Sequence, residues 1–206
     1  MNQTTAQRWV LASNNQGKVA EFQALFDAAA LDVQIITQGS LGIGDAIEDG
    51  ASFIENAIIK ARHAADASGL PAIADDSGLC VPVLGNAPGI YSARYAGTHG
   101  DDAANNAKLL SDLLPFRGDE PIEAFFVCVL ALVRHATDPM PLIAIGKWHG
   151  QVLTAPCGEH GFGYDPLFFV PSLGKSAAEL EKRAKNAISH RAKALQSLLA
   201  QLQADA

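Results

Sequence analysis

Two adjacent carboxylates, Asp75 and Asp76, are the residues of this sequence whose types and spacing are best suited to chemistry. They follow the apolar run at 70–73 and precede Ser77 and Gly78. This pattern predicts a buried strand that opens into a tight turn. Neighbouring side chains of a strand point to opposite faces. We therefore expect one acid to project into a pocket and the other to hold backbone groups, a plain hydrophilic turn being the alternative.

A polar segment near the N-terminus has the composition of an anion-binding loop. It lies between a predicted strand at 8–12 and a predicted amphipathic helix at 19–30, and it consists of Ser13, Asn14, Asn15, Gln16, Gly17 and Lys18. Backbone N–H groups and the helix dipole converge at such a position, and Lys18 adds a full positive charge. The spacing is not that of a Walker motif. Phosphate binding is one interpretation, and helix capping by Ser13 and the asparagines is the other.

Glu48 precedes a predicted helix that carries Lys60. Ser52 and Glu55 form a capping box, so the helix is expected to begin there and to end near residue 67. At 100° per residue, its core face is predicted to hold Ile54, Ala57, Ile58, Ala61 and Ala65, and its polar face Asn56, Lys60 and His63. Glu55 is assigned to capping. Glu48 has no structural role visible in the sequence and is the better candidate ligand. Lys60 either lines a cleft or faces solvent.

A glycine-rich segment at 158–166 surrounds two aromatic residues and ends in Asp-Pro. Glycines let the backbone approach a planar ligand closely while a ring stacks on it. On this interpretation the ligand contacts are made by Phe162, Gly163, Tyr164 and Asp165. The alternative is a glycine-rich bend whose aromatic residues belong to the core.

Basic residues gather near the C-terminus, at Lys185, His190 and Arg191. One continuous helix from the capping box at 176–179 would place Lys185 and His190 about 140° apart, too far to reach one ligand. Ser189 is a good N-cap, so we expect a helix break at 187–189 and a new helix from His190. The break would let the three side chains converge. The alternative is a continuous surface helix with scattered basic residues.

The remaining pattern indicates an α/β protein. Alternating or continuous apolar residues predict strands at 31–35, 123–134 and 141–154, the last two joined as a hairpin, and a helix that is capped by Asp102 and stopped by Pro115. The chain has 206 residues, 49% of them hydrophobic, and a net charge of −7. This charge argues against a nucleic-acid surface. The longest apolar run, 124–133, is half the roughly 20 residues of a membrane helix. Three dispersed cysteines fit a reducing compartment. A cytoplasmic protein without a membrane partner is expected.

Six ordered motifs across residues 9–199 resemble those of the inosine/xanthosine triphosphate pyrophosphatase family. The motifs are Ser13-Asn14-Asn15-Gln16-Gly17-Lys18, Phe53-Ile54-Glu55-Asn56-Ala57, Ala74-Asp75-Asp76-Ser77-Gly78, Pro88-Gly89-Ile90-Tyr91-Ser92-Ala93-Arg94, Gly161-Phe162-Gly163-Tyr164-Asp165-Pro166 and Ser189-His190-Arg191. One departure is Asn14, where the family's loop usually has glycine. Asparagine tolerates a left-handed backbone better than most residues, so the loop is expected to survive.

The resemblance implies a single domain over residues 1–206 with an elongated mixed central sheet, flanking helices and two lobes around a substrate cleft, assembled as a homodimer. It also implies Mg²⁺-dependent hydrolysis of ITP, dITP or XTP to the monophosphate and pyrophosphate. Glu48 and Asp76 would bind the metal, and Asp76 would be the general base. Phosphates would be held by residues 13–18 and Ser77, with Lys60 a further candidate. The base pocket would be formed by residues 162–165, Lys185, His190 and Arg191.

Two other functions stay open at this point. One is a related pyrophosphatase acting on pyrimidine or modified nucleotides, and the other is a nucleotide-binding module without catalysis.

Overall fold

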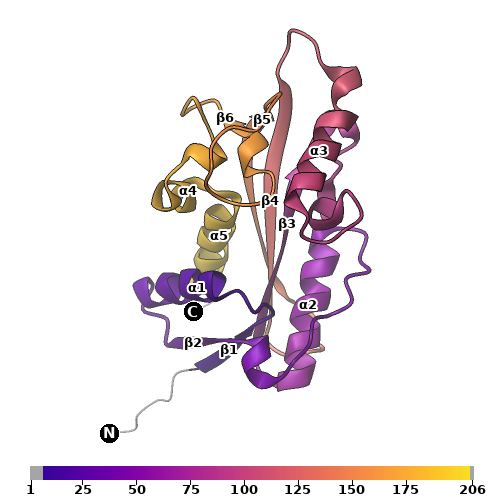
Figure 1. The fold of residues 1–206 in the computed structure, drawn as a ribbon. Helices are drawn as coiled ribbons and strands as arrows, with labels where there is room; N and C mark the ends of the chain where they lie inside the picture. The colour runs from indigo at the N-terminus through magenta and orange to yellow at the C-terminus, as the bar shows by residue number, and fades with distance from the viewer. Residues whose placement is uncertain (1–6, 205–206) are drawn as a thin grey trace, which may run out of the picture. The chain divides into compact units, whose positions relative to one another are not determined.

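The computed structural model describes residues 7–204, and the ends of the predicted 1–206 domain lie outside that range. The prediction of an α/β fold is confirmed: a seven-stranded sheet in the order β2-β1-β3-β4-β5-β6-β7 is flanked by helices (Figure 1). The strands are β1 (Gln7–Leu11), β2 (Val33–Thr37), β3 (Ala72–Cys80), β4 (Ile122–Val133), β5 (Leu142–Val152), β6 (Phe168–Val170) and β7 (Lys175–Ser176). The α-helices are α1 (Gln16–Ala28), α2 (Phe53–Ser68), α3 (Asp102–Asp112), α4 (Lys182–Ile188) and α5 (His190–Ala204).

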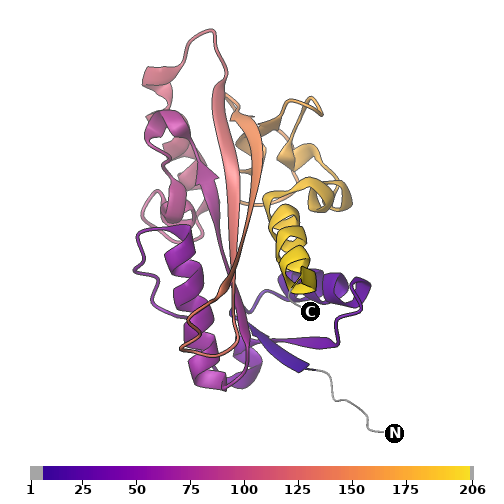
Figure 2. The same ribbon diagram turned by 180° about the vertical axis from the view of Figure 1, so that it is seen from behind.

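The chain forms two compact units. Of the described residues, unit 1 holds 7–76, 129–145 and 194–204, and unit 2 holds 77–128 and 146–193. In unit 1, β1 pairs in parallel with β2 on one side and with β3 on the other. Right-handed crossovers to opposite sides of β1 place the two connecting helices on opposite faces of the sheet. Accordingly α1 and the C-terminal part of α5 lie on one face and α2 lies on the other (Figures 1 and 2).

Helix α1 is anchored in unit 1 by aromatic packing. Phe22 and Phe26 are fully buried, and the Phe26 ring meets the edge of Trp9 on β1 at a centroid distance of 5.5 Å. The helix N-cap is Asn15, whose side chain accepts a hydrogen bond from the Lys18 N–H. The first turn of α1 is therefore closed by Asn15, and a later turn is packed on β1 through Phe26.

Helix α2 begins as predicted. Its N-cap is Ser52, whose Oγ accepts from the Glu55 N–H at 3.2 Å and donates to the Glu55 carboxylate at 2.8 Å. The predicted faces are partly wrong, because Ile54 is 39% exposed whereas Asn56 is only 1% exposed. Asn56 is buried because its amide has partners on both sides, at the Gly50 N–H and the Asp76 carboxylate.

The predicted turn at Asp75–Gly78 is wrong. β3 runs without interruption from Ala72 to Cys80, through both aspartates and the glycine. The strand lies between β1 and β4 in the sheet, and pairing with its neighbours keeps it extended where the local sequence favours a turn. One N–H beyond the acids, that of Leu79, is satisfied by the Ser92 hydroxyl at 2.9 Å. The two carboxylates are thus held on a strand and not on a flexible loop.

Unit 2 has its own hydrophobic core. Phe126 on β4, Trp148 on β5 and Phe168 on β6 form its aromatic centre, with ring centroids 4.6 to 6.4 Å apart. Leu109 and Leu113 of the α3 segment are fully buried against it. β6 pairs antiparallel with both β5 and β7. Helix α3 differs slightly from prediction, since its N-cap is Asp101 and not Asp102.

The C-terminal segment shows the predicted break. α4 ends at Ile188, Ser189 has extended backbone angles, and its Oγ accepts from the Ala192 N–H at the start of α5. The capping box at Ser176 caps a short 3-10 helix at Ala177–Glu179, and α4 begins later, at Lys182. Within residues 7–204, none of the helices combines the length and the apolar character that crossing a membrane requires.

Candidate active site

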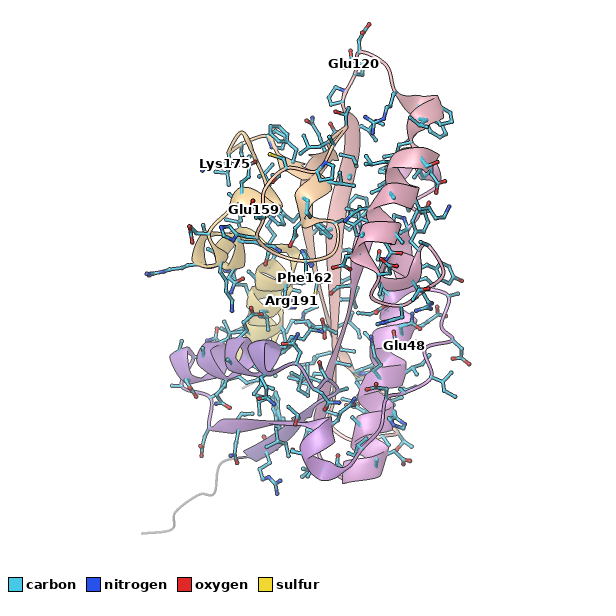
Figure 3. The ribbon with its side chains drawn as sticks, viewed as in Figure 1. Glu48, Glu120, Glu159, Phe162, Lys175 and Arg191 are labelled. Atoms are coloured by element: carbon cyan, nitrogen blue, oxygen red, sulfur yellow. The ribbon has the colours of Figure 1, made fainter. Side chains whose placement is uncertain are left out.

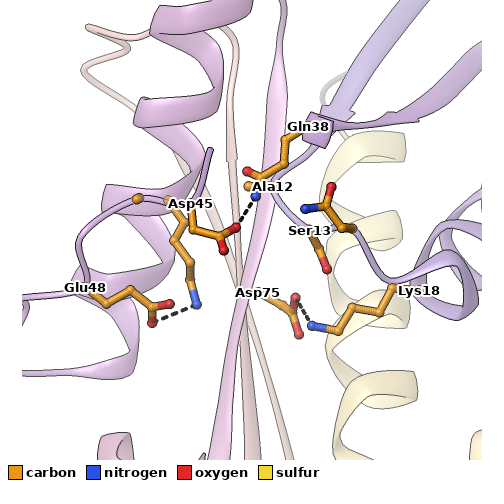
Figure 4. A pocket seen from close by; sticks show the side chains of 10 residues that line it. Ala12, Ser13, Lys18, Gln38, Asp45, Glu48 and Asp75 are labelled. Atoms are coloured by element: carbon orange, nitrogen blue, oxygen red, sulfur yellow. Dashed lines mark hydrogen bonds and ion pairs between the residues drawn. The ribbon is translucent and has the colours of Figure 1, made fainter. Parts of the chain in front are cut away.

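Unit 1 contains a polar pocket with a volume of about 340 Å³ (Figure 4). It opens beside the end of β1, the start of α1 and the middle of β3, so the segments singled out by their sequence meet there. The residues that line it are Ala12, Ser13, Asn14, Lys18, Gln38, Asp45, Ala46, Glu48, Lys60 and Asp75. Positively charged lysines and negatively charged carboxylates therefore face one small volume.

One side of the pocket is closed by an ion pair between Lys18 and Asp75 (Figure 4). The Lys18 Nζ lies 2.7 Å from the Asp75 Oδ1, and the Asp75 side chain is 3% exposed. The preceding loop is ordered by its own side chains, since the Ser13 Oγ accepts from the Asn15 N–H and Asn15 caps α1. Gln16 and Gly17 form the first turn of the helix. Capping and pocket lining are thus combined in this segment.

Asn14 links the same loop to the segment after β2. Its Oδ1 accepts from the Gly39 N–H at 2.8 Å. The non-glycine residues with positive φ in the described chain are Ala30 and Asn86, so Asn14 does not use the left-handed backbone that its replacement of glycine suggested. Here asparagine contributes a hydrogen bond that glycine could not make.

The other side of the pocket carries three charged groups in contact. The Lys60 Nζ donates to the Glu48 Oε2 at 3.0 Å and to the Asp76 Oδ1 at 3.0 Å. The Asn56 amide approaches the second oxygen of Asp76 at 3.4 Å. Lys60, left open between a cleft and solvent, is therefore directed inward, with its side chain 15% exposed.

This contact changes the proton affinities of its members. Burial is the largest influence on Asp76 and, with the charge of Glu48, raises the pKa of that carboxyl above its ordinary value, although Lys60 and Asn56 oppose the shift. Burial alone would lower the pKa of Lys60, but the charges of Asp76 and Glu48 and the hydrogen bonds to both raise it. A carboxylate destabilised by burial beside a second acid is typical of functional sites.

The donor set around Lys60 fits a hard divalent cation. Glu48 and Asp76 already converge on one positive group, the Lys60 ammonium. In the part of the chain that the structure describes, no group of three or more His, Cys, Asp or Glu side chains is arranged to hold a metal. Mg²⁺ suits such a site, because it takes one or two carboxylates and fills its remaining positions with water and phosphate oxygens.

Ser77, the residue after Asp76, carries a buried hydroxyl. Its Oγ has no hydrogen-bond partner among residues 7–204. Buried polar groups are nearly always paired in folded proteins. A hydroxyl left over at this position fits a residue that bonds to a ligand.

In unit 2, Asp165 organises the glycine-rich segment. Its Oδ2 accepts from the Phe162 N–H at 2.9 Å and from the Lys185 Nζ in a short ion pair. The same ammonium lies 5.0 Å from the centre of the Phe162 ring. Asp165 and Lys185 are both largely buried, with side chains 3% and 14% exposed, whereas Phe162 is 68% exposed. The structure thus brings Lys185 together with Phe162 and Asp165. That these residues bind one ligand stays a prediction.

The two aromatic residues of this segment divide between the predicted alternatives. Phe162 is exposed, and Tyr164 is 4% exposed and belongs to the core of unit 2. The Tyr164 hydroxyl donates to the Ser92 carbonyl at 2.9 Å. Gly163, between them, has a φ of 61°. The ring available to a ligand is therefore that of Phe162 (Figure 3).

His190 and Arg191 begin α5 directly after the break. The His190 ring stacks on Phe126 with a centroid distance of 5.0 Å and an interplanar angle of 19°. The imidazole is thus held flat against the aromatic centre of unit 2. Arg191, labelled in Figure 3, is half-buried. Convergence of these two side chains with Lys185 stays a prediction.

Several residues that line or support these sites were missed in the sequence. They are Gln38 and Asp45, joined by a hydrogen bond of 2.6 Å in the pocket, Asn56 beside Asp76, and Asp102 and Asn106, which bind Gly163. Their partners lie 7 to 61 residues away. Ordinary polar residues at such separations carry no local signal, except that Asn56 lies one turn from Lys60 on α2.

Known proteins resemble this chain in both sequence and fold. A sequence model of the Ham1 family matches residues 9–201. A dITP/XTP pyrophosphatase of Acinetobacter baumannii (strain ACICU) is 70% identical over 195 residues, which is 94% of each chain. A dITP/XTP pyrophosphatase of Burkholderia pseudomallei (strain K96243) is 60% identical over 198 residues, covering 95% of this chain and 93% of that one. Among solved structures, a HAM1 protein from Coxiella burnetii matches with a TM-score of 0.90 and 47% identity, covering 96% of this chain and 99% of that one.

Proposed function

This chain belongs to the Ham1 family, and from that premise we propose that it hydrolyses the non-canonical purine nucleotides dITP, ITP and XTP to the monophosphate and pyrophosphate. Relatives 60 to 70% identical over nearly their whole length are named dITP/XTP pyrophosphatase. The observation that carries the proposal is the contact of Glu48, Lys60 and Asp76 beside a lysine-lined pocket. Two lysines and several carboxylates in one small volume suit a triphosphate that arrives with a cation.

In the proposed reaction a water molecule attacks the α-phosphorus, and the bond between the α-phosphate and the leaving pyrophosphate breaks. Asp76 orients the water and accepts its proton, a role that its raised pKa supports. Lys18, Lys60 and the N-terminal N–H groups of α1 hold phosphate oxygens. The unpaired Ser77 hydroxyl provides one more contact. The whole of residues 13–18 is proposed as the phosphate loop.

We propose Mg²⁺ as the metal and Glu48 and Asp76 as the residues that hold it. When bound, Mg²⁺ supplies positive charge that neutralises the phosphate oxygens. Asn56 supports this role by donating to the Oδ2 of Asp76, whereas Lys60 donates to the Oδ1. Releasing Lys60 from the two carboxylates would free its ammonium for a phosphate.

For the base, we propose that Phe162 stacks on the purine and that Lys185, His190 and Arg191 line the polar edge. Inosine and xanthosine carry a carbonyl oxygen at the purine 6-position, where adenosine carries an amino group. Arg191 has five N–H donors and no acceptor, and His190 can add another donor. Such donors favour the oxygen and leave an amino group facing another donor, which costs roughly 1–3 kcal/mol per mismatched group.

We also propose that the protein is cytoplasmic and forms a homodimer. The cytoplasmic location rests on the three dispersed cysteines, which fit a reducing compartment. The dimer rests on the resemblance to the family. Sedimentation analysis should give twice the chain's mass at micromolar concentration, and a monomer there would contradict the dimer.

The function is tested by measuring pyrophosphate release from a panel of nucleotides with Mg²⁺ and with a chelator in its place. We expect dITP, ITP and XTP to be hydrolysed at least about 10²-fold more efficiently than ATP, and the chelator to stop turnover. Preference for a pyrimidine or modified nucleotide would favour a related pyrophosphatase. If the parent protein hydrolysed nucleotides no faster than Asp76→Asn, a binding module without catalysis would be favoured.

A further inference from the structure

One residue of the exposed aromatic segment is held at both of its peptide groups by a single helix. The Asp102 Oδ2 accepts from the Gly163 N–H at 2.7 Å. The Asn106 Nδ2 donates to the Gly163 carbonyl at 2.9 Å. Asp102 and Asn106 are one turn apart on α3, so their side chains lie on one face of the helix. Together they form a two-point clamp on Gly163, which lies 57 to 61 residues further along the chain.

The clamp acts directly on the backbone of Phe162. The Phe162 N–H donates to Asp165, and the next N–H, that of Gly163, donates to Asp102. The peptide groups on both sides of the Phe162 Cα are therefore fixed by carboxylates. Asp165 is in turn balanced by Lys185, and Asp102 lies in the first turn of α3, where a negative charge is favourable. A side chain that is 68% exposed is thus carried on an unusually well-held backbone.

Stability alone does not account for Asn106. Its Oδ1 is buried and has no hydrogen-bond partner in the part of the chain that is described. A buried acceptor without a partner lowers stability and offsets the gain from the one bond that the amide makes. Leucine would fill a similar volume without that penalty. Retaining asparagine here makes sense if the position of Gly163 matters for binding.

We infer that Asp102 and Asn106 are positioning residues for the nucleotide base, because they fix the Phe162 ring on which the base stacks. The inference rests on the proposed function. An exposed ring gains little from stacking if its backbone must be ordered at each binding event, since that ordering reduces affinity. The clamp removes this cost in advance. Neither residue needs to touch the substrate, and the phosphate pocket of unit 1 does not depend on them.

The test compares two clamp variants with a matched control on the same helix. Asn106→Leu and Asp102→Ala each break one arm of the clamp. Asp101→Ala removes the neighbouring aspartate, which caps α3 by accepting from the Ala104 N–H and does not bind Gly163. Asp102→Asn keeps an acceptor oxygen and is the conservative variant. For each protein, thermal unfolding is measured together with calorimetric binding of inosine monophosphate and of pyrophosphate, and with kcat and KM for dITP.

We expect Asn106→Leu and Asp102→Ala to weaken inosine monophosphate binding and to raise the KM for dITP by about 10-fold, on the order of losing one base–aromatic stack. Pyrophosphate binding and kcat should change less than about 3-fold, since the reacting groups are untouched. Asp101→Ala should lower the unfolding temperature and leave nucleotide binding at the parental value. Asp102→Asn should bind nearly as the parent does.

Parental nucleotide affinity in folded Asn106→Leu and Asp102→Ala would overturn the inference. An equal loss of affinity in Asp101→Ala would also overturn it, because general weakening of α3 would then be the cause. A parent protein that neither binds inosine monophosphate nor hydrolyses dITP would instead overturn the proposed function, and with it the role assigned to the clamp. The parent measurements therefore separate the two failures.

Discussion

The pocket of unit 1 and the aromatic segment of unit 2 use the same type of residue pair for different purposes. Each contains a lysine in contact with a buried aspartate: Lys18 with Asp75 in unit 1, and Lys185 with Asp165 in unit 2. In unit 1 the pair lines an open pocket beside further charges. In unit 2 the aspartate also accepts from the backbone of Phe162, so the pair supports an exposed ring.

The difference concerns what happens to the charges on binding. A triphosphate carries several negative charges, so it must draw the lysines of unit 1 away from their carboxylates or bring a cation that satisfies those carboxylates. The lysines and carboxylates there are therefore expected to exchange partners when the triphosphate binds. The pair in unit 2 needs no such exchange, because the ligand proposed there is an uncharged base and because Asp165 also accepts from the Phe162 backbone. We expect substitutions in the two regions to separate accordingly.

The largest effect is expected from the acids of unit 1. Asp76→Asn and Glu48→Gln should each lower the rate of pyrophosphate release by roughly 10²–10⁴-fold, because each removes a proposed metal ligand and Asp76→Asn also removes the base. The fold should be retained, since the carboxylate of Asp76 is already destabilised by burial. Glu55→Gln is the matched control. Glu55 caps α2, the helix that follows Glu48 and carries Lys60, and its variant should keep parental turnover. Near-parental rates in a folded Asp76 or Glu48 variant would remove that residue from the mechanism.

On the unit 2 side, Arg191→Ala should alter the choice of base. We expect kcat/KM for ITP to fall by about 10²-fold and kcat/KM for ATP to fall far less, since only the 6-oxo group accepts from the lost donors. Lys193→Ala is the control, because Lys193 lies two residues further along α5 and its Nζ donates to the Lys147 carbonyl. A fall by the same factor for both nucleotides would make Arg191 a phosphate or structural residue.

Asp138 shows what a purely structural carboxylate of unit 1 looks like. Asp138 is 2% exposed and accepts from the N–H groups of Arg134 and Met140 and from the Arg134 guanidinium. Burial would raise the pKa of Asp138, but these donors outweigh it and lower the pKa to about 2. The pKa of Asp76 shifts in the opposite direction, because burial there outweighs the effects of Lys60 and Asn56.

Asp138→Asn should therefore change stability and leave activity alone. A lowered pKa stabilises the folded state at pH values above the unfolded pKa of about 4. That contribution should be lost as the pH falls towards about 2. We expect a loss of about 1–3 kcal/mol in the free energy of unfolding at pH 7, because the new amide sets N–H groups against donors. Urea unfolding at pH 7 and pH 3 checks this, and an Asp138→Asn protein with the parental pH dependence would contradict it.

Local sequence was sufficient where the structure depends on local contacts. The cap at Ser52 and the break at Ser189 were predicted, because each follows from a side chain that bonds to the backbone within about one turn. Capping of α1 by an asparagine was one of two interpretations, but the helix begins at Gln16, three residues earlier than predicted. The same rule failed at Asp75–Gly78. There the neighbouring strands decide the conformation, and the turn residues stay extended.

The site was predictable in its charged residues and less so in its support. Lys18, Glu48 and Lys60 were candidates from residue type and position, and Asp76 was assigned through the family resemblance. The structure places all four at or beside one pocket. Asn56 was assigned to a polar face, but it is buried against Asp76. The bonds of Asp102 and Asn106 to Gly163 depend on tertiary packing alone. No local pattern in a single sequence indicates contacts between residues that lie this far apart in the chain.

The smallest effect concerns the link between Asn14 and Gly39 in unit 1, and a double-mutant cycle isolates it. A Cβ atom at Gly39 would collide with the Asn14 carboxamide, and the three atoms nearest to that Cβ all belong to Asn14. Gly39→Ala should therefore cost about 1 kcal/mol of stability by displacing the amide and its hydrogen bond. Asn14→Gly should cost a similar amount, since it removes the same bond.

In the Asn14→Gly background the obstacle is absent, and Gly39→Ala should then be neutral within about 0.5 kcal/mol. The KM for dITP should rise a few-fold in both single variants and no further in the double variant, because the link is already lost. Base preference should not change, since the loop belongs to the phosphate side and not to the aromatic segment of unit 2. Strictly additive losses of stability would show that Gly39 is constrained by something other than Asn14, and a change in base preference would remove the contrast between the two regions.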